Sequence, residues 1–167
     1  IMTLANQIQY VIESVEEWEA TCVRQAETLV KNFRQERIAR QADWFSQAAS
    51  NGRPKGRHSV EAWCPLNLFA RKHNGSLQIY WQLVFRDRAT RSIGYKHLAK
   101  TVRGGYDMRR LLAHAKSFER DLVTDYEEEA QLQRLRWAQY TRLRRELIQM
   151  AKANGAEGAL VMRRRSQ

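Results

Sequence analysis

Amide, cationic and aromatic side chains occupy alternate positions along two neighbouring segments of this sequence. Residues 77–85 alternate between apolar and polar types with a period of two, which predicts a strand with one polar face. Paired with the segment before it, the strand would carry on that face Asn67, Phe69, Arg71, Gln78, Tyr80 and Gln82. A two-stranded ribbon of this kind fits the DNA major groove, where Arg reads guanine and Asn or Gln reads adenine. Alternatively, Phe69 and Tyr80 pack under a helix, and the amides are hydrogen-bonding residues at the sheet edge.

A short basic loop precedes this hairpin. The segment Gly52 to His58 carries Arg53, Lys55 and Arg57 among Gly and Pro, and it resembles the core of an AT-hook. In such a segment an extended backbone lies in the narrow minor groove, where its cations meet a negative potential. We therefore expect DNA contacts from these three cations, the alternative being a solvated, flexible linker.

The positive charge is concentrated in the centre of the sequence. The chain has 29 Lys and Arg against 18 Asp and Glu, for a net charge of +11 and a pI near 10.2. Residues 51–107 hold 11 basic and 3 acidic residues, a net charge of +8, whereas residues 1–50 stand at −2 and residues 108–167 at +5. This balance is typical of a protein that binds a polyanion, and nucleic acid is the first partner to consider.

Further cations follow the hairpin in quick succession, where acids are scarce. We expect phosphate contacts from Lys72, Arg86, Arg88, Arg91, Lys96, Lys100 and Arg103. A solvated surface is the alternative. The arginines from Arg134 to Arg145 are spread around a helix, so most are predicted to be solvated or in interhelical ion pairs.

The sequence does not favour catalysis. No pair of carboxylates, metal-ligand cluster or nucleophile with its base occurs at a useful spacing, and the four His are scattered. We therefore predict no enzyme activity, no cofactor and no metal. Cys22 and Cys64 lie about 40 residues apart without a CxxC motif, so both are expected to be buried thiols.

Two long helices are predicted to flank the basic centre. Residues 3–50 and 107–154 contain neither Pro nor Gly, and Asp107 is a good N-cap for the second helix. The Gly104–Gly105 pair before it lacks the spacing of a nucleotide-binding loop. In the first helix, apolar residues spaced three or four apart form a heptad-like seam that includes Leu4, Ile8, Val11, Val15, Trp18, Cys22 and Leu29. On the second we expect an apolar stripe that includes Leu122, Tyr126, Leu132, Leu135, Leu143, Leu147 and Met150.

Asn74–Gly75 predicts a tight hairpin turn that pairs Leu66 with Leu83, Leu68 with Trp81 and Ala70 with Ile79. A third strand is expected at residues 91–97. An even loop before it would put Ile93 and Tyr95 on the polar face, and an odd, bulged loop would put them on the core face. We favour the bulged loop.

The fold class that follows is α+β. Residues 1–154 are predicted to form one domain, with two long antiparallel helices flanking a small three-stranded antiparallel sheet, and residues 155–167 a basic, disordered tail. No apolar run approaches the roughly 18 residues that span a bilayer, so we expect no membrane partner and a cytoplasmic location.

Three segments together resemble the central part of MobI-type conjugative transfer proteins. They are Pro65–Leu68, Gly75–Gln82 and Gly94–Leu98, and the flanking helices fit as well. The resemblance implies an auxiliary relaxosome factor of integrative conjugative elements and conjugative plasmids. Such a factor binds double-stranded DNA at the origin of transfer and assists a separate relaxase.

The sequence leaves several alternatives open. The long seams favour a homodimer, although an intramolecular helix pair would also satisfy them. A coiled-coil scaffold or a sequence-specific transcriptional regulator would use similar residues. RNA is also an alternative ligand, because aromatic rings beside Arg on a sheet suit unstacked bases.

Overall fold

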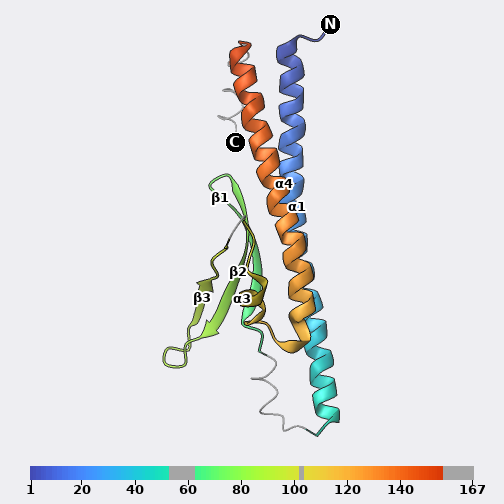
Figure 1. The fold of residues 1–167 in the computed structure, drawn as a ribbon, viewed down its shortest axis with the longest axis vertical. Helices are drawn as coiled ribbons and strands as arrows, with labels where there is room; N and C mark the ends of the chain where they lie inside the picture. Colours follow the sequence, from blue (N-terminus) through green and yellow to red (C-terminus); the bar gives the residue numbers. More distant parts are fainter. Residues whose placement is uncertain (53–62, 102–103, 156–167) are drawn as a thin grey trace. The chain divides into compact units, whose positions relative to one another are not determined.

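The computed structural model describes residues 1–52, 63–101 and 104–155 (Figure 1). The elements are α1 (Leu4–Ser50), β1 (Leu66–His73), β2 (Ser76–Arg86), β3 (Ile93–His97), α3 (Met108–Leu112), the 3-10 helix η2 (Ser117–Glu119) and α4 (Arg120–Ala153). The predicted α+β class and the first helix are confirmed. The chain forms two compact units: unit 1 takes Ile1–Arg24 and the chain from Leu135 on, and unit 2 takes Gln25–Arg134.

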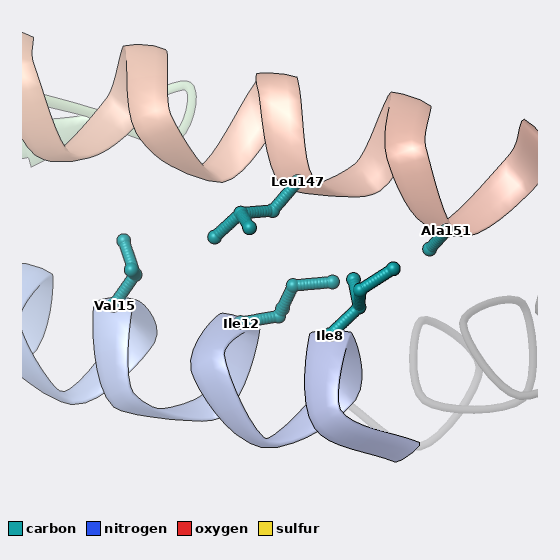
Figure 2. Packing of buried hydrophobic residues seen from close by; sticks show 5 residues of the cluster. All are labelled: Ile8, Ile12, Val15, Leu147 and Ala151. Carbon is teal, nitrogen blue, oxygen red and sulfur yellow. The ribbon is translucent and has the colours of Figure 1, made fainter. Parts of the chain in front are cut away.

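Unit 1 is a pair of antiparallel helical segments. Ile8, Ile12 and Val15 of α1 face Leu147 and Ala151 of α4 and form its buried core (Figure 2). Polar and aromatic contacts continue this packing along the pair. The Glu19 carboxylate accepts a hydrogen bond from Arg144 Nε at 3.0 Å, and the Trp18 and Tyr140 rings lie 5.5 Å apart.

The predicted seam of α1 is confirmed as buried at Ile8, Val15, Cys22 and Leu29 and is wrong at three positions. Burial repeats at positions 8, 12, 15, 19 and 22, whereas Leu4, Val11 and Trp18 are 56%, 39% and 44% exposed. These three residues lie beside the buried stripe, which contains Ile12 and faces Leu147 and Ala151. The predicted stripe of the second helix is likewise right only in part, because Leu122 and Leu147 are buried whereas Leu132, Leu135, Leu143 and Met150 are exposed.

Unit 2 holds the sheet, whose strand order is β1-β2-β3. The predicted register of the hairpin is confirmed, with Leu66 opposite Leu83, Leu68 opposite Trp81 and Ala70 opposite Ile79. Asn74 and Gly75 have φ angles of 49° and 73°, the left-handed conformations that a two-residue turn of type I′ requires. These residue types therefore set the register of the hairpin.

The third strand has the even register, so the bulged loop predicted from the sequence is wrong. Ile93 lies opposite Arg86 and Tyr95 opposite Val84, which puts both side chains on the polar face. On the core face Gly94 lies opposite Phe85, and a Cβ atom at residue 94 would lie only 2.4 Å from that ring. The Phe85 ring thus occupies the space that a side chain on β3 would need.

The second long helix starts later than predicted. Asp107 is an N-cap, as expected, because its carboxylate accepts the N–H groups of Arg109 and Arg110, but it caps the five-residue α3. The chain then turns and α4 begins at Arg120. Glu119 explains the new start, because its buried side chain accepts the Lys116 N–H at 3.1 Å and thereby caps the following helix.

Trp81 is the largest fully buried side chain of the sheet. Its ring packs edge-on against the ring of Phe33 of α1, with centroids 5.1 Å apart. The Phe33 ring in turn packs against Tyr126 of α4, with centroids 5.4 Å apart. We call the face of the sheet that carries Trp81 the inner face and the opposite one the outer face. Burial of the inner face against the two helices positions the outer face.

Candidate nucleic-acid interface

The outer face carries most of the polar residues that the sequence selected. Strand alternation and the observed register place Asn67 and Arg71 of β1 on the same face as Gln78, Tyr80, Gln82 and Arg86 of β2. Lys72 and Lys96 fall on the inner face, opposite Leu77 and Leu83, although both are exposed. The structure thus groups six of the predicted contact residues and separates two lysines from them.

Three rings cross the outer face from strand to strand, and we call Phe69, Tyr80 and His97 the aromatic row. The Phe69 and Tyr80 rings are stacked, with centroids 5.9 Å apart and planes 19° apart. Tyr80 and His97 are 4.8 Å apart and tilted by 33°. Phe69 and Tyr80 are half-buried and His97 is exposed.

Two guanidinium groups lie over the row. Arg34 of α1 places its Cζ 5.3 Å from the Phe69 centroid, and Arg71 of β1 places its Cζ 5.4 Å from the Tyr80 centroid. Arg71 is oriented by Gln78, whose Oε1 accepts a hydrogen bond from Arg71 Nε at 2.9 Å. A guanidinium has five N–H donors, so Arg71 keeps further donors for a ligand.

The two other outer-face amides are engaged within the protein. Asn67 Oδ1 accepts a hydrogen bond from Arg37 Nη2 at 2.6 Å, and its Nδ2 donates to the Pro65 carbonyl at 3.2 Å. Gln82 is buried, and its Nε2 lies 2.6 Å from His97 Nε2. Asn67 and Gln82 therefore match the predicted alternative of hydrogen-bonding residues within the sheet, whereas Arg71 and Gln78 are more accessible to a ligand.

A cluster of cations lies at the end of the hairpin where β2 leads into β3. Arg86, Arg88 and Arg91 are all exposed, and we call them the basic end. Asp87 is the acid within this cluster, and its carboxylate accepts the N–H groups of Ala89 and Thr90 at 2.8 and 3.4 Å. These backbone hydrogen bonds lower the pKa of Asp87 and fix the carboxylate within its own turn.

The remaining predicted contact residues lie elsewhere. Lys100 is in the segment after β3, where partial burial and the nearby charge of Arg134 lower its pKa. Arg53, Lys55, Arg57 and Arg103 lie outside the described residues, as does residue 156 onward of the predicted tail. The AT-hook-like loop therefore stays a prediction.

Two contributors on α1 were not selected from the sequence. Arg34 and Arg37 reach β1 from the helix, and Arg37 Nη1 also donates to the Leu66 carbonyl at 2.6 Å. A signal was present, because Arg34, Arg37 and Arg40 recur every three residues on a helix that is acidic overall. Arg40 bonds instead to the Phe118 carbonyl and the Asp121 carboxylate.

The helical arginines divide between two roles. Arg144 makes the predicted interhelical ion pair with Glu19. Arg134 is almost completely buried, and its guanidinium bonds Glu127, two turns earlier on the same face of α4, and the Ile79 carbonyl of β2. Arg134 therefore attaches the sheet to α4 and is not part of a solvated face.

Other chemistry has little support in the described part of the chain. No group of three or more His, Cys, Asp or Glu suited to a metal ion occurs among the described residues. A pocket of about 140 Å³, lined partly by Leu98, Tyr106 and His114, is smaller than typical cofactor sites, which measure roughly 300–1,000 Å³. Cys22 and Cys64 are buried thiols, as predicted, and neither is in a disulfide within the described part of the chain. None of the helices in the described ranges combines the length and apolarity needed to cross a bilayer.

Fold and site together define a small α+β protein whose sheet presents a polar, aromatic and basic face. The family model of the MobI protein matches residues 24–148, and the chain therefore belongs to the MobI family. This membership makes it an accessory protein of conjugative transfer. No curated protein and no solved structure gives a significant match.

Proposed function

We propose that this protein binds double-stranded DNA at the origin of transfer through the outer face and the basic end, and assists a separate relaxase. The observation that carries the proposal is the grouping of Arg71 and Gln78 with Arg86, Arg88 and Arg91 along one β-ribbon. Family membership supports the setting in conjugation.

The contacts divide by the chemistry of their side chains. Arg86, Arg88 and Arg91 are exposed cations near a turn, which suits them to phosphates and to setting the register of the ribbon on a duplex. Arg71 and Gln78 form a hydrogen-bonded pair of planar groups on the strands, so they are the candidates for reading base edges. Specificity is therefore assigned to the strands and salt-dependent affinity to the basic end.

The protein is also proposed to act as a homodimer through unit 1. Leu4, Gln7, Val11, Ser14 and Trp18 recur every three or four residues on α1, beside the buried seam. The stripe contains no charged residue, and its three large apolar members are exposed. Single exposed apolar residues are ordinary, but a heptad-spaced row of them marks a docking surface.

A second copy is the occupant that this stripe fits. An uncharged, heptad-spaced stripe requires a partner helix that is also uncharged and heptad-spaced, and the stripe itself meets both conditions. Val11 lies midway between Leu4 and Trp18 in the sequence, so an antiparallel two-fold axis near Val11 would put Leu4 beside Trp18 of the second copy. Such a dimer would bring two sheets to an inverted repeat.

Binding to a labelled origin duplex against a scrambled duplex of equal length tests the function. We expect the origin duplex to stay bound near 150 mM salt while the scrambled duplex dissociates. Arg71→Ala should relax this preference, because removing a bidentate base contact costs about 1–3 kcal/mol of discrimination. Lys72→Ala is the matched control, because Lys72 is the neighbouring cation on the opposite face. Equal binding of both duplexes at every salt concentration would contradict specific recognition.

A further inference from the structure

The aromatic row can stack on nucleic-acid bases, and contacts with a duplex do not use such stacking. Phe69, Tyr80 and His97 come from three different strands, and their centroids follow one another at 5.9 and 4.8 Å across the outer face. A protein side chain in a groove of duplex DNA reaches base edges and phosphates, because neighbouring bases cover each base face. Rings that stack need bases whose faces are free.

The cations beside the row are placed for the same kind of ligand. Arg34 and Arg71 lie over the Phe69 and Tyr80 rings, at 5.3 and 5.4 Å from the centroids. Unstacked bases stack on aromatic rings and also on guanidinium planes, and the charge of the guanidinium attracts the phosphates of the same strand. Ring and cation thus occur together at both Phe69 and Tyr80.

The aromatic row is not part of the buried core of the sheet. The core of the sheet lies on the other face, where Leu66, Leu68 and Trp81 are fully buried. On the outer face Tyr80 is half-buried and His97 is exposed. Gln82 orients the exposed ring by its contact with His97 Nε2 at 2.6 Å.

We propose that the aromatic row binds the unpaired bases of single-stranded DNA, with Tyr80 as the central stacking platform. The inference rests on the proposed function, since it assigns to the same outer face a second form of the same DNA. The basic end holds phosphates whether the DNA is paired or unpaired. The row adds affinity only where bases are unstacked.

Binding of the full chain to the origin duplex and to each of its separated strands tests this assignment. Tyr80→Leu removes the ring and keeps a smaller apolar side chain, and Tyr80→Phe is the matched control that keeps the ring. We expect Tyr80→Leu to weaken single-strand binding on the order of 10-fold, a clearly larger loss than for the duplex, with Tyr80→Phe close to wild type. Equal melting temperatures of the three proteins would show that they fold alike.

The other outcomes show whether the inference or the proposed function is wrong. Equal loss of duplex and single-strand binding in Tyr80→Leu would make the row part of the duplex surface, which overturns the inference and leaves the proposed function in place. Single-strand binding that is insensitive to Tyr80→Leu would also overturn it. Tighter binding of an RNA of the same sequence would assign the row to RNA. Failure of the wild type to bind either form of DNA would contradict both proposals. If Tyr80→Leu does not fold, Phe69→Leu against Phe69→Tyr provides the same comparison.

Discussion

The indole N–H of Trp81 donates to Oε2 of Glu127 at 2.7 Å, and Arg134 bonds both oxygens of the same carboxylate at 2.9 and 3.0 Å. Arg134 Nε also donates to the Ile79 carbonyl at 2.8 Å, and its Cζ lies 5.2 Å from the Tyr106 centroid. The Tyr106 hydroxyl accepts a hydrogen bond from the Trp81 backbone N–H at 3.0 Å. Trp81 lies one residue beyond the part of β2 that pairs with β3, which ends at Gln82 opposite His97. This network joins the inner face of the sheet to α4 and so holds the outer face in position.

Removal of Arg134 should therefore be strongly destabilising. Arg134→Met leaves the Glu127 carboxylate buried without its cation, and we expect the free energy of unfolding to fall by about 3–5 kcal/mol. Urea unfolding measures the loss. Arg142→Met is the control, because the Arg142–Glu146 pair is exposed and should contribute less than about 1 kcal/mol. Similar losses in the two variants would show that the buried pair is not the main attachment of the sheet.

Gly94 should be required for the third strand. Gly94→Ala brings a Cβ atom to 2.4 Å from the Phe85 ring, and we expect a loss of about 1–3 kcal/mol from this overpacking. Amide hydrogen exchange should become faster in residues 93–97. The double variant with Phe85→Leu removes the obstructing ring and should recover part of the protection. Unchanged hydrogen exchange in Gly94→Ala would mean that the Phe85 ring moves aside without loss of stability.

The stability of unit 2 should fall in alkaline solution because of Cys64. Burial, followed by the charge of Glu119, raises the pKa of the Cys64 thiol from 9.0 to about 12. A raised folded-state pKa stabilises the protein fully below pH 9, and this contribution is lost as the pH rises from 9 toward 12. Relative to Cys64→Ala, the wild type should lose up to about 1.4 kcal/mol per pH unit in that window. Urea unfolding at pH 8, 9 and 10 measures the difference, and parallel profiles would contradict it.

The uncharged stripe of unit 1 predicts a dimer that a single charge disrupts. Val11→Glu would put a carboxylate at the centre of the proposed interface, where its desolvation is costly. Light scattering at tens of micromolar should report a dimer for the wild type and a monomer for Val11→Glu. Asn6→Glu adds the same charge at an exposed position off the stripe and should stay dimeric. A monomeric wild type would contradict the self-association.

The hairpin could be predicted in detail because its determinants are local. Asn74–Gly75 fixes the turn, and strict alternation along the strands then fixes which residues share the inner face with Trp81. The third strand was predicted, but its register could not be, because the register depends on the Phe85 ring filling the space beside Gly94. The predicted seam of α1 was wrong at Val11 for a similar reason. Whether Val11 or its neighbour Ile12 is buried depends on the position of the partner helix.

The candidate site was predictable in composition and less so in its connections. The alternation that predicts β2 also places Arg71, Gln78 and Tyr80 on one face. The hydrogen bonds that engage Asn67 and Gln82 involve Arg37 and His97, which lie 30 and 15 residues away in the sequence. Contacts at such separations follow from the tertiary fold and leave no local signal.

The salt dependence of origin-duplex binding in two charge-matched triple variants tests the central claim most directly. One replaces Arg86, Arg88 and Arg91 by Gln, and the other replaces the exposed Arg136, Arg145 and Lys152 of α4 by Gln. Both lose three charges. We predict that the first loses affinity and that the slope of log K against log salt falls by about 0.9 for each lost phosphate contact, while the second stays close to wild type. Equal effects in the two variants would show that binding follows net charge alone, and would contradict a DNA interface at the basic end.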